Sequence, residues 1–206
     1  MTKSLLSKNI QRATVLVALF FAKAGFATTE TYRDIIEKSY NLSLQKDRAQ
    51  AMTILMSAFK RESKKSVAQK ELAAAIDQVG KVFYSDKAQQ LYELALSLRL
   101  TDSPTAFSKL QDASRLEPEN ISIEVALARQ LISNGDCDGA QARILKQKEY
   151  LPAIEDLRLA SAQAQLCNGK TVEYQSIRQL QDIKQSSFAV YWLVLESEYF
   201  FRTGSF

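Results

Sequence analysis

The chain has 206 residues, of which 46% are hydrophobic, and it carries 27 basic and 23 acidic residues. Four of the basic residues and none of the acidic ones lie in residues 1–27, so the rest of the chain has 23 charges of each sign. This balance disfavours nucleic-acid binding, which needs a strongly basic face, and the length suffices for one elongated domain with a substantial core.

Residues 1–27 are predicted to be a secretory signal peptide. Three basic residues precede an apolar run over residues 13–22, and Gly25-Phe26-Ala27 supplies small residues at a cleavage point. A run of that length spans about 15 Å as a helix, roughly half of a bilayer core, so a membrane anchor is disfavoured. We expect export across the inner membrane to the periplasm, with no membrane-spanning segment in the mature protein. Cleavage after Ala24 is the competing site.

Beyond residue 27 the pattern predicts helices throughout, because the period-2 alternation of a half-buried strand is missing from it. Only six glycines and three prolines occur in the chain, so the connections must be short, as between antiparallel helices. The expected helices cover residues 31–44, 47–62, 66–83, 86–100, 103–116, 121–133, 137–149, 153–167, 170–184 and 187–202.

A fixed spacing relates two sets of positions in this series of helices. The residues Ala106, Leu110, Ala113 and Pro118 return as Ala140, Ile144, Gln147 and Pro152, and Gly135 returns as Gly169. A period of about 34 residues marks stacked helical hairpins, in which no unit buries its apolar face alone. Small residues at i and i+7 lie on one helical face and let two backbones pack closely, and each proline marks the end of a hairpin.

This pattern resembles the tetratricopeptide repeat family, whose unit is two antiparallel helices in about 34 residues. The second-helix pattern of the family is matched in full over 106–118, and over 140–152 except at Gln147. The first-helix pattern is matched best near the end of the chain, by Trp192, Leu195 and Tyr199.

The resemblance implies an all-α fold, a right-handed α-solenoid of antiparallel hairpins. Tetratricopeptide-like repeats are expected over residues 85–206, with the last repeat incomplete. Residues 28–84 are expected to form N-terminal hairpins of a degenerate kind. They keep apolar residues in register but lack the alanine and proline signature: Leu72, Ile76, Val79 and Tyr84.

Cys137 and Cys167 are the only two cysteines in the sequence. Export would bring both into an oxidising compartment, and the repeat register places both at one edge of adjacent hairpins. We therefore predict a disulfide, with two unpaired and partly buried cysteines as the alternative. Two cysteines without any histidine leave a zinc ligand set incomplete, so we expect no metal site.

The sequence carries no signature of catalysis. It has no histidine, which removes the commonest general base and every Ser-His or Cys-His pair. Neighbouring carboxylates such as Glu155 and Asp156 point in different directions on a helix and are interpreted as a solvated face. Glycine-rich phosphate and dinucleotide motifs are missing as well, so we expect neither enzyme activity nor a cofactor.

The predicted function is that of a scaffold or interaction module. The family resemblance implies that a protein or peptide partner binds a concave surface lined by the first helix of each hairpin. Outward positions on those helices are Tyr92, Arg99, Arg129 and Gln163, with ordinary solvated surface as the alternative for each. Reversing both arginines to glutamate is expected to weaken binding without affecting stability. A structural subunit or assembly factor of an envelope complex, or less favourably a cell-wall hydrolase, remains open.

The last predicted helix has apolar residues on every side. An exposed apolar surface is expected to include Trp192, Leu195, Tyr199 and Phe200. Solenoids normally end on a polar outer face, and leaving one such aromatic side chain in water costs about 1.5 to 3 kcal/mol. We expect the helix to be covered by another chain, by a second copy in a homo-oligomer, or by further residues of a longer repeat protein, the last being favoured.

Overall fold

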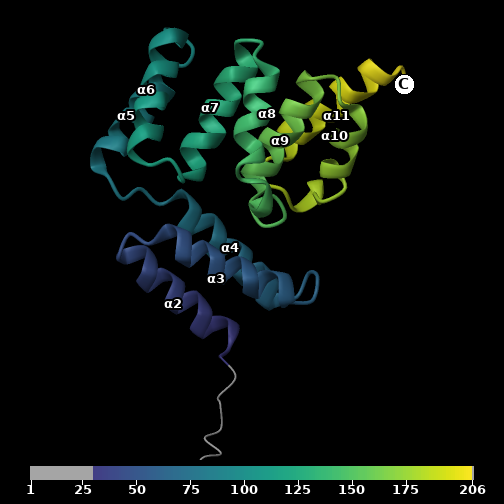
Figure 1. The fold of residues 1–206 in the computed structure, drawn as a ribbon. Helices are drawn as coiled ribbons and strands as arrows, with labels where there is room; N and C mark the ends of the chain where they lie inside the picture. Colours follow the sequence, from purple (N-terminus) through teal and green to yellow (C-terminus); the bar gives the residue numbers. More distant parts are fainter. Residues whose placement is uncertain (1–29, 206) are drawn as a thin grey trace, which may run out of the picture. The chain divides into compact units, whose positions relative to one another are not determined.

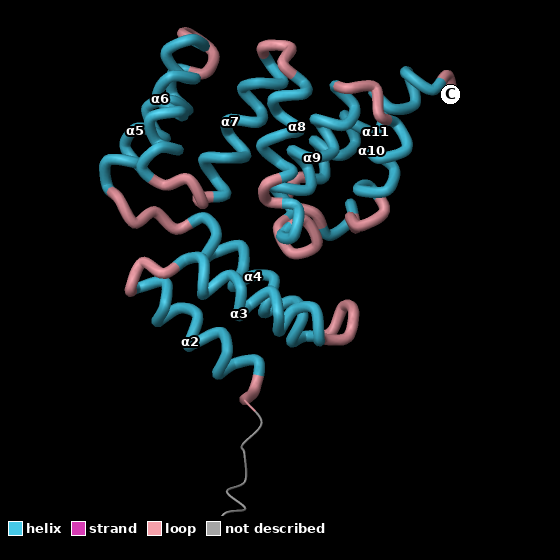
Figure 2. Tube along the Cα trace, viewed as in Figure 1, coloured by secondary structure: helices cyan, strands magenta, loops and turns pink. Residues whose placement is uncertain are grey.

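A computed structural model describes residues 30–205. The predicted signal peptide, residues 1–27, lies outside the described residues. Figure 2 shows helices joined by short loops, and the described part of the chain contains no strand. None of the helices in this part is both long enough and apolar enough to cross a bilayer.

The order of the predicted helices is confirmed (Figure 1). In chain order they are α2 (Tyr32–Leu44), α3 (Arg48–Arg61), α4 (Val67–Lys81), α5 (Asp86–Leu98), α6 (Ser103–Leu116), α7 (Ile121–Ser133), α8 (Cys137–Leu145), α9 (Glu155–Cys167), α10 (Thr171–Arg178) and α11 (Ala189–Thr203). Two short 3-10 helices, η1 (Lys148–Tyr150) and η2 (Ile183–Gln185), follow α8 and α10.

Polar residues in front of the helices explain where most of them begin. Each accepts a hydrogen bond from a backbone N–H in the first turn that has no partner inside the helix. Such a cap contributes about 1 kcal/mol to helix stability. The capping side chains are Asp47, Ser66, Ser85, Asp102, Asn120 and Asp136.

Helices α8 and α10 end well before the predicted ends at 149 and 184. In both places the guanidinium group of an arginine donates hydrogen bonds to backbone carbonyl groups outside the helix. The Arg158 guanidinium donates to the carbonyl oxygens of Leu151 and Pro152 at 2.8 and 2.9 Å. Similarly, Arg178 donates to the carbonyl oxygen of Gln181 at 3.1 Å. These contacts stabilise irregular turns in segments whose apolar pattern alone would continue the helix.

The repeat pattern of the sequence corresponds to a repeated packing arrangement. Helices α5 and α6, α7 and α8, and α9 and α10 pack as hairpins, and α7, α9 and α11 pack in succession. The alanines of the pattern, Ala106, Ala113 and Ala140, are fully buried at these contacts. Gly135 and Gly169 adopt left-handed conformations after α7 and α9, with φ of 80° and 69°, which glycine tolerates best.

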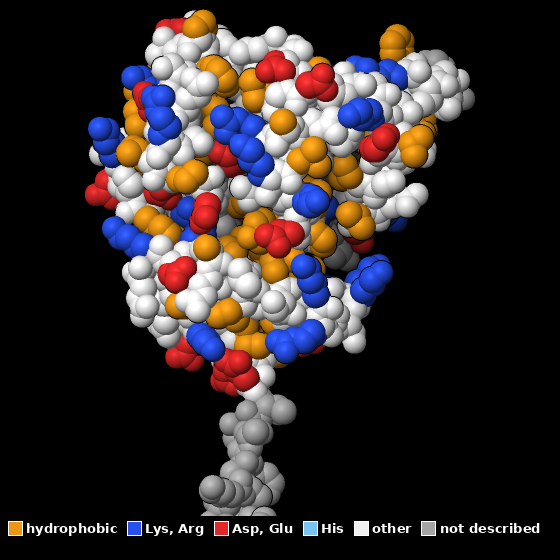
Figure 3. All heavy atoms as spheres, viewed as in Figure 1, with side chains coloured by type: hydrophobic (Ala, Val, Ile, Leu, Met, Phe, Trp, Pro, Cys, Tyr) orange, Lys and Arg blue, Asp and Glu red, His pale blue; other side chains and the backbone are white. Residues whose placement is uncertain are grey.

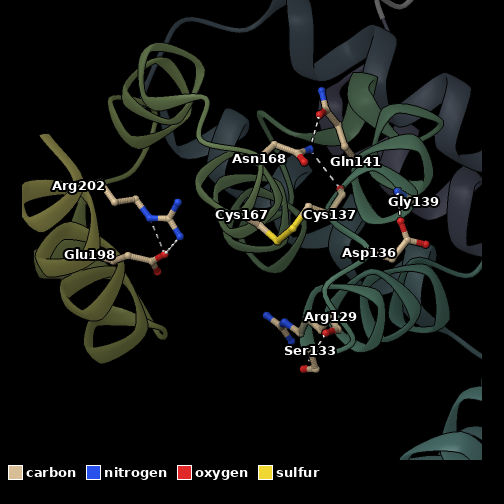
Figure 4. The surroundings of a disulfide bond; sticks show 10 residues. All are labelled: Arg129, Ser133, Asp136, Cys137, Gly139, Gln141, Cys167, Asn168, Glu198 and Arg202. Atoms are coloured by element: carbon tan, nitrogen blue, oxygen red, sulfur yellow. Dashed lines mark hydrogen bonds and ion pairs between the residues drawn. A yellow bond between two sulfur atoms is a disulfide. The ribbon is translucent and has the colours of Figure 1, made fainter.

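A disulfide joins Cys137 and Cys167, as predicted. It links the first residue of α8 to the last residue of α9, with a Cα–Cα distance of 5.5 Å (Figure 4). Beside it, the Asn168 side chain donates to the carbonyl oxygen of Cys137 at 3.2 Å and to Gln141 Oε1 at 2.8 Å. Adjacent hairpins are therefore tied together at the edge that the repeat register indicated.

The three N-terminal helices pack together and contact α7 through α4, past the α5–α6 hairpin. Helices α2, α3 and α4 contact one another, α4 contacts α7, and Leu55 and Ile76 share a core with Ile121. A Cβ atom at Gly80 in α4 would lie only 3.0 Å from Ile121 Cγ1 and 3.3 Å from Met52 Cε. This close approach favours glycine, because a larger residue would have to displace Ile121 or Met52 slightly, and it brings α4 directly against the start of α7.

The predicted exposure of the last helix is wrong for two of its four residues. Trp192 and Leu195 are buried, at 0% and 5% exposure, in a cluster with Leu159 of α9 and Tyr174 of α10. Of the other two, Tyr199 is half-buried against that cluster, and Phe200 is 43% exposed. The apolar pattern could not show which side of α11 meets α9, because the helix is apolar on opposite sides.

A buried ion pair connects α3 to the segment between α6 and α7. Arg48 Nη2 lies 2.8 Å from Glu117 Oε2, and both side chains are 5% exposed. Glu117 Oε1 accepts hydrogen bonds from the backbone N–H groups of Tyr84 and Ser85, each at 2.7 Å. Burial alone would raise the pKa of Glu117, but the hydrogen bonds from Arg48 and these amides together lower it below its usual value.

We predict that Glu117→Gln lowers the free energy of unfolding by about 3 kcal/mol, because it leaves the Arg48 charge buried without its partner. Because the pKa of Glu117 is lowered in the folded state, its contribution is present above the unfolded pKa of about 4.3 and is lost as pH falls through the folded value. Urea unfolding at several pH values should therefore show the difference from wild type shrinking in acid.

Glu119→Gln is the matched control, since Glu119 is exposed and close by in the sequence, and its loss should change stability by no more than about 0.5 kcal/mol. Equal stabilities of the Glu117→Gln and Glu119→Gln proteins at neutral pH would contradict this role of the ion pair.

Candidate functional site

Three of the four predicted binding residues line one surface groove of about 270 Å³. They are Arg99, Arg129 and Gln163, and the groove is completed by Ile132, Ser133, Phe188 and Tyr191. The lining comes from α7, α9 and α11, together with Arg99, which directly follows α5, and Phe188, which directly precedes α11. Helices α5, α7, α9 and α11 correspond to the first helices of the hairpins that the sequence predicted.

Residues that line the groove recur along the chain with the same period as the hairpins. Ser133 lies one repeat period after Arg99, and Gln163 lies one repeat period after Arg129. Equivalent positions on successive helices therefore face the same groove. The register would have identified Ser133, which sequence reasoning missed.

Tyr92 lies at the margin of the groove. It lines a smaller adjoining cavity of about 40 Å³ together with Arg99, Arg129 and Asp156. Its ring packs against Phe83 with a centroid distance of 5.3 Å, and burial raises the pKa of its hydroxyl. Much of this side chain is therefore engaged in packing, and its predicted outward orientation is only partly realised.

Arg129 is held in place by a carboxylate. Its Nη2 atom lies 2.6 Å from Asp156 Oδ1, and the two side chains are 29% and 15% exposed. A glutamate at position 129 would place two carboxylates side by side in a partly buried site. The expectation that both arginines can be reversed without loss of stability is therefore corrected, and it is kept for Arg99 alone.

Arg99 is the arginine of the groove whose charge is not paired with a carboxylate among the described residues. Its side chain is exposed, and it makes no hydrogen bond or ion pair with any other residue that the structure describes. No carboxylate is among the residues that line the groove. Since Asp156 neutralises Arg129, the positive charge available to a ligand comes from Arg99.

Two aromatic rings form the other end of the groove. Phe188 and Tyr191 lie with their ring centroids 6.3 Å apart, and Tyr191 is 59% exposed. Between the aromatic and cationic ends, Gln163 contributes an Oε1 atom that is buried and accepts no hydrogen bond from the described residues. Sequence reasoning missed both rings, because they flank rather than belong to the repeat pattern.

The face of the molecule drawn in Figure 3 has mixed charge. On the face drawn in Figure 3, Lys and Arg side chains alternate with Asp and Glu, as the equal numbers of charges outside residues 1–27 suggest. Within residues 30–205, no group of three or more His, Cys, Asp or Glu is placed to hold a metal ion. The groove thus differs from its surroundings by its lack of carboxylates.

No protein-family model, curated protein or solved structure matches this chain. The all-helical fold and the disulfide are observed directly, whereas the tetratricopeptide resemblance rests on the repeat pattern of the sequence.

The groove combines two kinds of recognition. An exposed guanidinium can donate charge-assisted hydrogen bonds to a carboxylate, and aromatic rings can pack against apolar side chains. Ser133 is the one serine in the lining of the groove. Its hydroxyl group donates a hydrogen bond to the carbonyl oxygen of Arg129 at 3.1 Å. With no carboxylate or histidine in the lining to act as its base, Ser133 lacks the partner of an activated nucleophile.

Proposed function

We propose that this protein is a binding module that holds an acidic segment of a partner protein in the groove at Arg99. The observation that carries the proposal is the composition of the groove. Successive first helices supply its lining, one arginine in it has no carboxylate partner among the described residues, and no acidic side chain faces it. A carboxylate from a partner would complete this arrangement.

The size of the groove favours a peptide over a large cofactor. Its volume of about 270 Å³ lies just below the range of roughly 300–1,000 Å³ that is usual for small-molecule sites. It can hold a few side chains of an extended segment. The acidic part would lie at Arg99, and an apolar side chain would lie between Phe188 and Tyr191, where the exposed ring of Tyr191 offers contact area at low entropic cost.

Electrostatics sets the expected preference. Hydrogen bonds to charged groups contribute about 1.5–3 kcal/mol, which corresponds to about tenfold or more in affinity. We therefore predict that a fluorescent pool of acidic peptides binds the mature protein more tightly than a length-matched basic pool. Arg99→Glu should weaken binding of the acidic pool by about tenfold or more, as measured by fluorescence anisotropy.

Arg61→Glu makes the same charge change at an exposed position on α3 that does not line the groove, and it should leave affinity unchanged. Both variants should unfold within about 0.5 kcal/mol of wild type, since neither position is packed. Equal affinity for acidic and basic pools, or equal binding by the Arg99→Glu protein, would remove Arg99 from the site.

We also propose that the protein acts after export, in the periplasm. The charged start and short apolar run of residues 1–27 support export, and disulfides such as Cys137–Cys167 persist in oxidising compartments. We predict that protein isolated from cells without reductant begins at Thr28 and has both thiols protected from alkylation, as read by intact-mass spectrometry. A precursor retained in the membrane, or two free thiols, would contradict export to that compartment.

A further inference from the structure

Helix α11 has a second apolar side, opposite the one that packs on α9. We call it the outer face of α11, and it consists of Val190, Leu193, Val194 and Ser197. The three apolar members are 71%, 53% and 60% exposed in chain order. These residues stand at i, i+3, i+4 and i+7, so they form one stripe along the helix.

The repeat shows what this stripe corresponds to. Val125 of α7, Leu159 of α9 and Leu193 of α11 follow one another at intervals of one repeat period. Val125 and Leu159 are both 1% exposed, because the next first helix of the series covers them, whereas Leu193 is 53% exposed. The same contrast holds between Leu166, which is fully buried, and Phe200, which is 43% exposed. The outer face of α11 therefore corresponds to the packing surface that the next first helix covers on α7 and on α9.

We propose that a second copy of this chain covers the outer face of α11, with the two α11 helices antiparallel about a two-fold axis. Alternating spacings of four and three residues mark the contact positions of two helices that pack along their length. This spacing relates Val190, Val194 and Ser197. With the axis between positions 194 and 197, Val194 lies opposite the partner subunit's Ser197. Val190 lies level with the partner subunit's Phe201, which stands four residues beyond Ser197 on the same side of α11. The large and small residues of the stripe are thereby complementary to one another.

Charge also favours this pairing. The acidic residues of α11 are each neutralised within their own chain: Glu196 lies 2.8 Å from Arg178, and Glu198 lies 2.7 Å from Arg202. Two copies can thus approach without an unbalanced like charge at the seam. Antiparallel helices also place opposite ends of their dipoles together, and a two-fold contact closes on itself instead of growing into a filament.

The test is the mass of the mature protein by sedimentation equilibrium across a concentration series. One helix from each copy buries less than the roughly 1,600 Å² of a standard interface, so we expect a monomer–dimer equilibrium in the micromolar range. Val194→Glu places two carboxylates beside the two-fold axis and should give a monomer at every concentration. Val172→Glu is the matched control, since Val172 is 71% exposed on α10 outside the stripe, and it should dimerise like wild type.

A second measurement tests the direction of the helices. Because the native cysteines are already paired, Val194→Cys and Ser197→Cys each add one free thiol. Under mild oxidation, an antiparallel seam should cross-link a mixture of the two variants more than either variant alone, whereas a parallel seam would reverse that order. A wild-type monomer throughout the series, a Val194→Glu dimer, or stronger cross-linking of the separate variants would overturn the proposal.

Discussion

The buried carboxylate of Glu117 is the point at which the separate helical parts of this chain meet. Burying a charge is costly unless it is paired and fully hydrogen-bonded, so its donors must be held in one arrangement. Those donors are Arg48 of α3 and the backbone of residues 84–85 between α4 and α5. The adjoining Asn120 caps α7 and donates to the carbonyl oxygen of Val82 at 3.0 Å. One network thus fixes α3, the entry to α5 and the start of α7.

The candidate site depends on this placement of α7. Arg129 and Ser133 lie on α7 in the middle of the groove, with Arg99 on one side and Gln163 of α9 on the other. Further along the chain, buried alanines and the Cys137–Cys167 disulfide hold α8 and α9 together. A groove built from residues one repeat period apart therefore has walls stabilised by core packing and a covalent bond. Preorganisation of this kind reduces the entropy lost on binding.

Local signals in the sequence were enough to predict the helices and the disulfide. Capping residues, apolar periodicity and the returning alanines act within one hairpin or between neighbours. The contact of Gly80 with Ile121 could not be predicted, because it joins helices that are far apart in sequence. Asp156 was interpreted as solvated and instead pairs with Arg129. In the groove, Arg99, Arg129 and Gln163 were expected as outward positions of the first helices, but the aromatic end was missed since Phe188 and Tyr191 lie outside the repeat motif.

We propose that successive first helices form one surface on which a partner segment lies. Site-specific photo-cross-linking tests it most directly, with the cross-linking amino acid placed at Ser133 in the groove or at the exposed Gln111 of α6 outside it. In living cells we expect a discrete adduct from position 133 that is lost when Arg99→Glu is introduced, and none from position 111. Equal adducts from both positions, or an adduct at 133 that survives Arg99→Glu, would contradict it.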